Sequence, residues 1–330
     1  MRRTSHDKRE YLRYLLIALL VVFLISISLF LLQHWERQRG MFPSHEIGDD
    51  NLTYKGTEYV LKENIETFLV LGLDKTAGES KSDSYNNDQQ ADFLMLFVFD
   101  NDAETCSAIH VNRDTMADVN VLGVAGNRVA TVTEQIALSH TYGNGRDVSC
   151  RNTADAVSGL LMGMKVDHYI SFAMDSVTVL NDLVGGVEVV VSDDFTGVDD
   201  TLIKGETVTL KGEQALHYVR TRYGLEDSSN STRMKRQQQY IRALYDKYLQ
   251  RVAEDSAFVV DASLAMSDYI VSDRSVTQLQ ELARKFSEYE FLEISGLDGK
   301  FENGEQFVEF YADAESITEL VIDVFYRDKK

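Results

Sequence analysis

Apolar residues gather in short runs along this chain, and polar residues separate the runs. The runs at 67–73, 93–99 and 105–111 are nearly uninterrupted and are followed by Asp or Asn, which is typical of buried strands. Further periodic segments predict helices at 133–142, 153–162, 174–183, 257–287 and 314–325, and strands at 166–172, 187–191, 291–294 and 306–311. Because strands alternate with helices, we predict an α/β fold with a mixed sheet covered on both faces.

The first 35 residues have a different pattern. Residues 14–35 contain no Asp, Glu, Lys or Arg, and five arginines or lysines lie among the 13 residues before them. About 20 apolar residues cross a bilayer as a helix, and a basic flank marks the cytoplasmic side. No small-residue cleavage pattern follows the apolar run, which favours an uncleaved signal anchor over a cleaved signal peptide.

This interpretation divides the chain into a cytoplasmic basic tail (1–13), a single transmembrane signal anchor (14–35), an extracellular juxtamembrane tether (36–64) and an ectodomain (65–330). The ectodomain consists of a core (65–252) and a C-terminal part with helices and strands (253–330). We therefore expect a single-pass protein of the cell membrane, with its N-terminus in the cytoplasm and its ectodomain outside the cell.

Charge and cysteine content narrow the function. The formal net charge is -20, so the surface does not favour nucleic acid, and a DNA-binding regulator is excluded by both charge and topology. The two cysteines, Cys106 and Cys150, lie on the outer side, where oxidising conditions permit a disulfide. Two buried thiols are the alternative, and we expect the disulfide.

Charged side chains follow or begin three of the predicted strands. Asp74 comes directly after the first strand, Asp92 precedes the second, and Arg113 lies two residues beyond the third. Ligands of α/β sheets bind at such strand ends. Aspartate is also a common turn and cap residue, so each carboxylate alone has an ordinary structural explanation.

A basic segment at 213–241 strengthens the case for a ligand. It carries Arg220 and Arg222, then a polar loop, then Arg233, Arg236 and Gln237. Arginines suit bidentate contact with oxyanions, so this arrangement predicts a clamp for phosphate or pyrophosphate, although a solvated basic helix has similar composition. Two carboxylates with substrate phosphate oxygens suit Mg²⁺, and Mn²⁺ is the alternative metal.

At these residues the chain resembles the LytR-CpsA-Psr family of bacterial cell-envelope assembly. The matching strings occur in the family's order: FLVLGLD (68–74), QADFLML (90–96), NRDT (112–115), LSHTYGNG (138–145), DHYISF (167–172), LNDLVGGVEVVV (180–191), LKGEQALHYVRTR (210–222) and RMKRQQQYI (233–241). The resemblance implies an α-β-α sandwich with an apolar cleft for a polyprenyl chain. It also implies a phosphotransferase that moves a glycopolymer, such as teichoic acid or capsule, from polyprenyl pyrophosphate to a peptidoglycan hydroxyl as a phosphodiester.

The resemblance also assigns roles by position. It implies that Asp74 and Asp92 are metal-linked carboxylates and that Arg113 is a catalytic arginine; either carboxylate could act as the general base. It implies pyrophosphate contacts for Arg220, Arg222, Arg233 and Gln237, with Arg236 adjacent. The family has an arginine where this chain has Gln90, which removes one cation from the clamp.

Two alternatives share this ligand. One is a polyprenyl-pyrophosphate lipid-binding scaffold with little catalysis, to which Gln90 lends weight. The other is a hydrolase that transfers the same phosphate to water. In all three cases we predict that apolar residues of the helices within 153–183 line the lipid cleft.

Overall fold

A six-stranded mixed sheet forms the centre of the protein in a computed structural model that describes residues 51–77, 87–225, 229–255, 257–305 and 307–329. Its strands, in spatial order, are β11 (Ile270–Ser272), β8 (His168–Phe172), β3 (Ile65–Leu73), β4 (Ala91–Asp100), β5 (Thr105–Val111) and β12 (Glu290–Gly296). The pairs β3–β8 and β5–β12 are parallel, and the other neighbours are antiparallel. The predicted mixed sheet is therefore confirmed.

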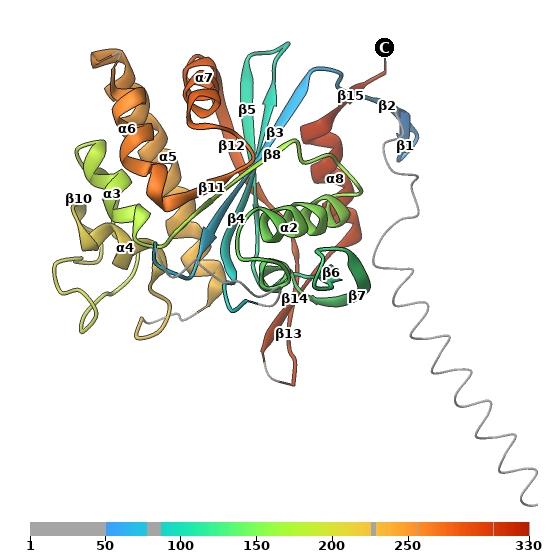
Figure 1. Cartoon of the computed structure of the whole chain (residues 1–330), viewed down its shortest axis with the longest axis horizontal. Coiled ribbons are helices and arrows are strands. Elements are labelled where there is room, and N and C mark those ends of the chain that lie inside the picture. The colour runs from blue at the N-terminus through green and yellow to red at the C-terminus, as the bar shows by residue number, and fades with distance from the viewer. Residues whose placement is uncertain (1–50, 78–86, 226–228, 256, 306, 330) are drawn as a thin grey trace, which may run out of the picture. The chain divides into compact units, whose positions relative to one another are not determined.

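Helices cover both faces of this sheet, as Figure 1 shows. On one side lie α5 (Asn230–Glu254) and α7 (Val276–Phe286), and on the other lie α2 (Asp147–Leu160) and α8 (Ala314–Phe325). The α5 and α7 face holds an aromatic core in which Phe99 stacks on Phe286 with ring centroids 3.5 Å apart. Burying such rings supplies much of the stability of a layered fold.

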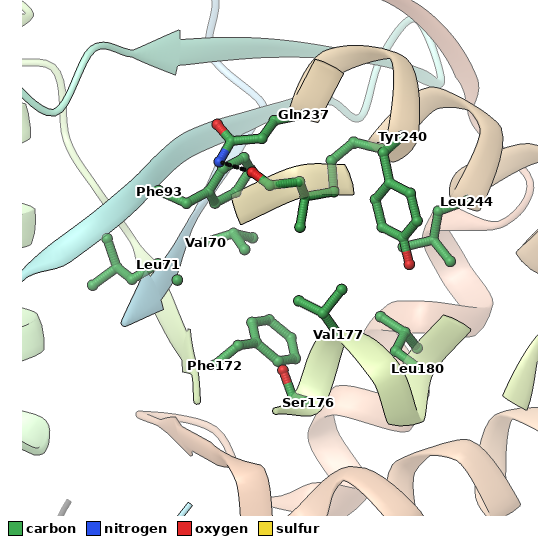
Figure 2. A pocket seen from close by; sticks show the side chains of 13 residues that line it. Val70, Leu71, Phe93, Phe172, Ser176, Val177, Leu180, Gln237, Tyr240 and Leu244 are labelled. Carbon is green, nitrogen blue, oxygen red and sulfur yellow. Dashed lines mark hydrogen bonds between the residues drawn. The ribbon is translucent and has the colours of Figure 1, made fainter. Parts of the chain in front are cut away.

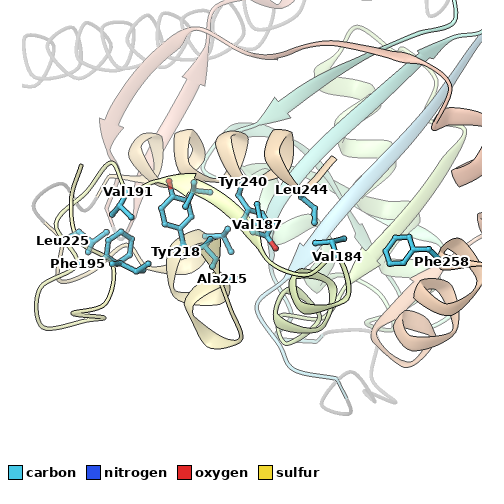
Figure 3. Close-up of a cluster of buried hydrophobic side chains, with 14 residues drawn as sticks. Val184, Val187, Val191, Phe195, Ala215, Tyr218, Leu225, Tyr240, Leu244 and Phe258 are labelled. Atoms are coloured by element: carbon cyan, nitrogen blue, oxygen red, sulfur yellow. The ribbon is translucent and has the colours of Figure 1, made fainter. Parts of the chain in front are cut away.

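A second buried cluster fixes the helices that carry the basic segment (Figure 3). It joins α5 to α3 (Ser176–Leu183), α4 (Glu213–Arg220), α6 (Phe258–Met266) and the small sheet of β9 (Val187–Val190) and β10 (Thr207–Leu210). Tyr218 of α4 and Phe195 are fully buried there and stack at 6.0 Å. The end of α4 is thus held rigidly against the start of α5.

Three small sheets and two short 3₁₀ helices complete the described residues. They comprise β1 (Asn51–Tyr54), β2 (Thr57–Leu61) and β15 (Tyr326–Asp328); β6 (Met116–Leu122) and β7 (Arg128–Gln135); β13 (Gly299–Asn303) and β14 (Val308–Ala312); and the helices η1 (Ile136–Thr141) and η2 (Ser267–Tyr269). Three predictions change. The helix expected at 133–142 is the end of β7 followed by η1, and residues 51–61 of the expected tether form two strands. The segment expected to be helical at 257–287 is divided into α6, η2 and α7 by β11, which joins the central sheet.

The predicted membrane segment lies outside the described residues, as do the basic tail and residues 36–50. Within the ranges given above, no helix has the combined length and apolar character needed to cross a membrane.

The predicted disulfide is not formed, because Cys106 and Cys150 are free and buried on opposite faces of the sheet. Cys106 belongs to the aromatic core together with Ile170. The Cys150 thiol lies 3.7 Å from His140 Nε2 and bonds to Ser171, the neighbour of Ile170 in β8. Successive strand residues point to opposite faces, so the sheet separates the two thiols. Burial raises the pKa of both to about 12.

Candidate active site

The register of the central sheet brings the three predicted strand-end residues together. Leu73 at the end of β3 pairs with Ala91 at the start of β4, and Leu94 of β4 pairs with Val111 at the end of β5. In the β3–β4 pairing, Gly72 pairs with Phe93 and Leu73 pairs with Ala91. Asp92 is therefore an extra residue of β4 without a partner in β3. Such a bulge re-aims a side chain at the sheet end.

Arg113 is the centre of the site. Its Nη1 donates to Asp92 Oδ1, its Nη2 donates to Gln90 Oε1, and its Nε lies 3.4 Å from Asp114 Oδ1. Only 15% of its side chain is exposed. Two acceptors and the nearby Asp114 carboxylate hold the plane of the guanidinium, whose Nε is buried without a hydrogen-bond partner among the described residues.

Arg233 approaches the same carboxylate from α5. Its Nη1 lies 3.2 Å from Asp92 Oδ2, and its Nε and Nη2 donate to Asn230 Oδ1 at 3.0 and 2.6 Å. Asn230 in turn donates to Asn112 Oδ1 at 2.6 Å, which ties the start of α5 to the end of β5. Burial lowers the pKa of Arg233, and the neighbouring Asp92 opposes that shift. One carboxylate therefore holds two arginines from different elements.

Asp74 is the less engaged carboxylate. Its Oδ1 accepts the backbone N–H of Gln90 at 3.0 Å. Burial raises the pKa of Asp74, and the negative charge of Asp92 raises it further. This shift indicates negative charge that is only partly balanced in the protein alone.

The other residues of the basic segment divide into two groups. Arg222 lies near enough for its charge to act on the pKa of Asp114 and of Arg233, and its Nη2 bonds to Tyr223 Oη. Arg220 is exposed, and the described residues give its side chain no hydrogen bond or ion pair. Of the two, Arg222 is therefore the one whose charge reaches the cluster around Arg113.

Arg236 corrects one part of the prediction. Only 1% of its side chain is exposed, and its nitrogens donate to Tyr218 O at 2.9 Å, to Asp193 Oδ2 at 2.5 Å and to Thr221 O. These partners leave it without access to a ligand. Because Thr221 stands between Arg220 and Arg222, Arg236 positions those two arginines instead of binding pyrophosphate itself.

An apolar cavity of about 150 Å³ opens beside this cluster (Figure 2). Its wall comes from the sheet, α3 and α5, and its members include Val70, Phe93, Val177, Leu180, Tyr240 and Leu244. Gln237 also lines it and donates to Val219 O at 3.1 Å. The prediction that residues within 153–183 line a cavity is therefore met by α3.

The cavity continues along the same face of the sheet. A second apolar cavity of about 250 Å³ shares Val70 and Phe172 with the first and extends to Phe99, Tyr248 and Phe286. Glycine is required at the first cavity's sheet wall, since a Cβ on Gly72 would come within 2.9 Å of Phe93 Cβ. Together the two cavities form an elongated apolar space between the sheet and α5.

No group of three or more His, Cys, Asp or Glu side chains within the described residues is arranged to hold a metal ion. Any metal at this site would therefore need ligand atoms from elsewhere, in addition to the two carboxylates.

Comparison with protein families now assigns the chain. The model of the LytR_cpsA_psr family matches residues 44–320, which includes every residue of this site. The chain belongs to this family. Curated relatives include the cell wall biosynthesis protein LcpA of Corynebacterium glutamicum, which is 29% identical over 70% of this chain and 47% of its own length. The polyisoprenyl-teichoic acid–peptidoglycan teichoic acid transferase TagU of Bacillus licheniformis is 25% identical over 75% of this chain and 73% of its own length.

Solved structures share the fold. The protein gbs0355 of Streptococcus agalactiae superposes with a TM-score of 0.64 at 19% identity, covering 79% of this chain and 86% of that one. TagT bound to LI-WTA superposes with a TM-score of 0.60 at 21% identity, covering 87% of this chain and 96% of that one. The chain spans only about half of LcpA, so the likeness extends to part of that relative.

Three residues of this LytR_cpsA_psr site were missed in the sequence: Asn112, Asp114 and Asn230. Each is buried and links a guanidinium or the start of α5 to the sheet. A signal was present for Asn112 and Asp114, which flank Arg113 in the sequence. Asn230 gives no such signal, because its bond to Asn112 joins positions that are 118 residues apart.

Proposed function

We propose that this chain is a membrane-anchored phosphotransferase that moves a glycopolymer from a polyprenyl-pyrophosphate carrier to a peptidoglycan hydroxyl. Membership of the LytR_cpsA_psr family and similarity to teichoic acid transferases support the reaction class. The structure of TagT with LI-WTA supports a wall glycopolymer as the donor's cargo. The predicted anchor at 14–35 would keep the site outside the cell and near its lipid substrate.

The observation that carries the proposal is the order of side chains along α5. Arg233 binds Asp92 at the arginine cluster, Gln237 comes one turn later at the cavity, and Leu244 lies deeper in its apolar wall. From Arg233 to Leu244 a helix rises about 16 Å at 1.5 Å per residue. One helix thus leads from an anion clamp into an apolar cavity, which matches a lipid that carries a pyrophosphate at one end.

The chemistry follows from this placement. The acceptor hydroxyl attacks the phosphorus that carries the glycan, the bond to the bridging oxygen breaks, and polyprenyl phosphate leaves. The new bond is a phosphodiester, and the hydroxyl proton passes to a base. Arg113 and Arg233 bind the charge that develops on the phosphate oxygens, and Arg222 approaches from α4. Asp74, whose pKa is raised by burial and by the charge of Asp92, is the carboxylate better suited to accept the proton when it is not bound to a metal.

The residues fit the divalent cation that the resemblance implies. Burial and the negative charge of Asp92 raise the pKa of Asp74, and a cation bound between the two carboxylates would oppose that shift; each Asp92 oxygen retains a lone pair after its arginine bond. Mg²⁺ takes one or two carboxylates and completes its shell with phosphate oxygens and water. Bound there, it would supply further neutralisation of the phosphates.

The test is transfer of a synthetic polyprenyl-pyrophosphate glycan to peptidoglycan fragments by the full chain in detergent, with and without Mg²⁺. Arg113→Ala should lower the rate about 100-fold or more, the scale seen when one oxyanion donor is removed. Arg128→Ala, an exposed arginine of β7, is the matched control and should keep wild-type activity.

Three results contradict the proposal in distinct ways. Release of glycan phosphate to water with every acceptor would make the protein a hydrolase. Tight lipid binding without turnover would make it a scaffold. Equal activity of the Arg113 and Arg128 variants would show that the chemistry occurs elsewhere.

A further inference from the structure

The hairpin of β13 and β14 exposes apolar side chains. Phe301 is 47% exposed, Phe307 is 62% exposed and Val308 is 46% exposed. Phe301 pairs with Phe310 across the hairpin, and the two rings lie 4.9 Å apart. Val308 shares this face with Phe310, since alternate strand residues point the same way. Exposed apolar patches often mark interaction sites, and aromatic residues are enriched in such sites.

This hairpin is joined to the active site. The N–H of Phe310 donates to Asp114 O at 2.8 Å, directly beside Arg113. Gln135 bridges the same two elements, donating to Asp114 Oδ1 at 3.2 Å and to Val308 O at 2.7 Å. Figure 1 shows the hairpin projecting from the body of the protein, free of the helices. Val308 comes two residues before Phe310 in β14, which places it about 7 Å from Phe310 toward the loop of the hairpin.

The hairpin and the lipid cavity lie on different sides of Arg113. Asp92 connects Arg113 to Arg233 and α5, where the cavity begins. Asp114 connects it to β14. A donor seated along α5 therefore leaves the hairpin side open to the second substrate.

The charge of the hairpin restricts its partner. The segment 299–312 carries Glu302, Glu305 and Glu309 against the single cation Lys300. Such a surface repels a polyanionic glycan and an anionic lipid surface, which attracts basic segments instead. An uncharged sugar has no such penalty, and the C–H faces of pyranose rings stack on aromatic rings.

We propose that the β13–β14 hairpin is the docking surface for the glycan acceptor, with Phe301 and Phe307 as stacking platforms for uncharged sugar rings. The acceptor hydroxyl would then reach Arg113 from the side opposite the lipid cavity. This inference rests on the proposed transferase function and names the place where its second substrate binds.

The test compares Phe301→Ser and Phe307→Ser with Val124→Ser. Val124 is 85% exposed and lies in the turn between β6 and β7, which makes it a matched apolar control. Three quantities are measured on the full chain: KM for soluble glycan chains of peptidoglycan, whose N-acetylglucosamine rings are uncharged, KM for the lipid donor, and binding to phosphatidylglycerol vesicles. Retention on purified peptidoglycan sacculi gives a readout that needs no turnover.

We expect each phenylalanine variant to raise the acceptor KM about tenfold, the effect of truncating one aromatic anchor. Donor KM, vesicle binding and the control should be unchanged. Phe307→Ser keeps the test valid should Phe301→Ser unfold the hairpin, since Phe307 is the more exposed of the two.

Loss of vesicle binding with an unchanged acceptor KM would overturn the inference in favour of a membrane contact, and unchanged values throughout would overturn it outright. Absence of transfer by the wild type would refute the transferase, while retention on sacculi would still decide the role of the hairpin.

Discussion

Replacing Asp92 by Asn would leave two arginines without the carboxylate that both bind. Asp92 Oδ1 accepts from Arg113 and Oδ2 accepts from Arg233 at 3.2 Å. The side chain of Arg233 is 6% exposed and that of Arg113 is 15% exposed, so neither cation can turn fully to water. We therefore expect Asp92→Asn to destabilise the ligand-free protein.

The magnitude follows from burial. Removing one partner of a fully buried ion pair costs about 3–5 kcal/mol. Asp92 is 27% exposed, and the amide oxygen of asparagine still accepts one bond, so we reduce the expected loss to about 2 kcal/mol. For a domain of this size that loss corresponds to a Tm lower by about 4–8 °C.

Inorganic pyrophosphate, added without Mg²⁺, should reverse much of this loss. Its negative charges would take the place of the missing carboxylate, so it should raise the Tm of the variant more than that of the wild type. Asp118→Asn is the control, because Asp118 is exposed and accepts a bond from the Thr133 hydroxyl at 2.9 Å. A variant that melts with the wild type, or that pyrophosphate does not rescue beyond the control, would refute the view of these arginines as an anion clamp.

Three further predictions test the interior. Burial lowers the pKa of His140 to about 4; the unfolded chain therefore binds the proton first, and stability should fall by about 2 kcal/mol from pH 7 to pH 5. In urea unfolding, His140→Gln should remove that part of the pH dependence, and an unchanged slope would count against it. Cys106 and Cys150 should react with a thiol reagent only after unfolding, and a reductant should leave the Tm unchanged; rapid labelling of native protein would contradict their burial. Arg236→Lys should cost about 3–5 kcal/mol in chemical denaturation, because lysine cannot serve three separated acceptors; Arg128→Lys should be neutral.

Strands β3, β4, β5 and β8 were predictable because each is a largely apolar, buried run, whereas β11 lies within the segment 257–287 that was expected to be helical. The strand predicted at 105–111 and the helix predicted at 314–325 have the same bounds in the structure. Strands β9 and β14 of the small sheets were predicted, but the other small strands were not, because their pairing is distant or their composition is polar. Leu61 of β2 pairs with Tyr326 of β15, so part of the expected tether joins the other end of the chain. The last three residues of β7, 133–135, were predicted as the start of a helix because their spacing contains no trace of their pairing with β6.

The site was predictable in its members and less so in their roles. The buried residues of α5 include Arg233, Arg236, Gln237 and Tyr240, which follow helical spacing. That spacing indicates that all of them face the protein, and it distinguishes none of them as a ligand contact. The residues around each arginine distinguish their roles. Asp92 lies beside Arg233, whereas backbone oxygens and Asp193 surround Arg236. The role of an arginine depends on acceptors contributed by other elements.

Gln90 stands where the resemblance implies an arginine, and its contacts in the structure show what it does instead. The Oε1 atom of Gln90 accepts a hydrogen bond from Arg113 Nη2. A carboxylate in this place could accept the same bond, but its negative charge would cancel the positive charge of the arginine. An amide orients the guanidinium without adding charge, so Asp92 remains the strong partner that Arg113 shares with Arg233. An arginine at position 90 would add a cation but could not accept this bond. The clamp of this chain therefore has one cation fewer and holds its central arginine in a fixed plane, and fixed donors stabilise a developing charge without the cost of reorganisation.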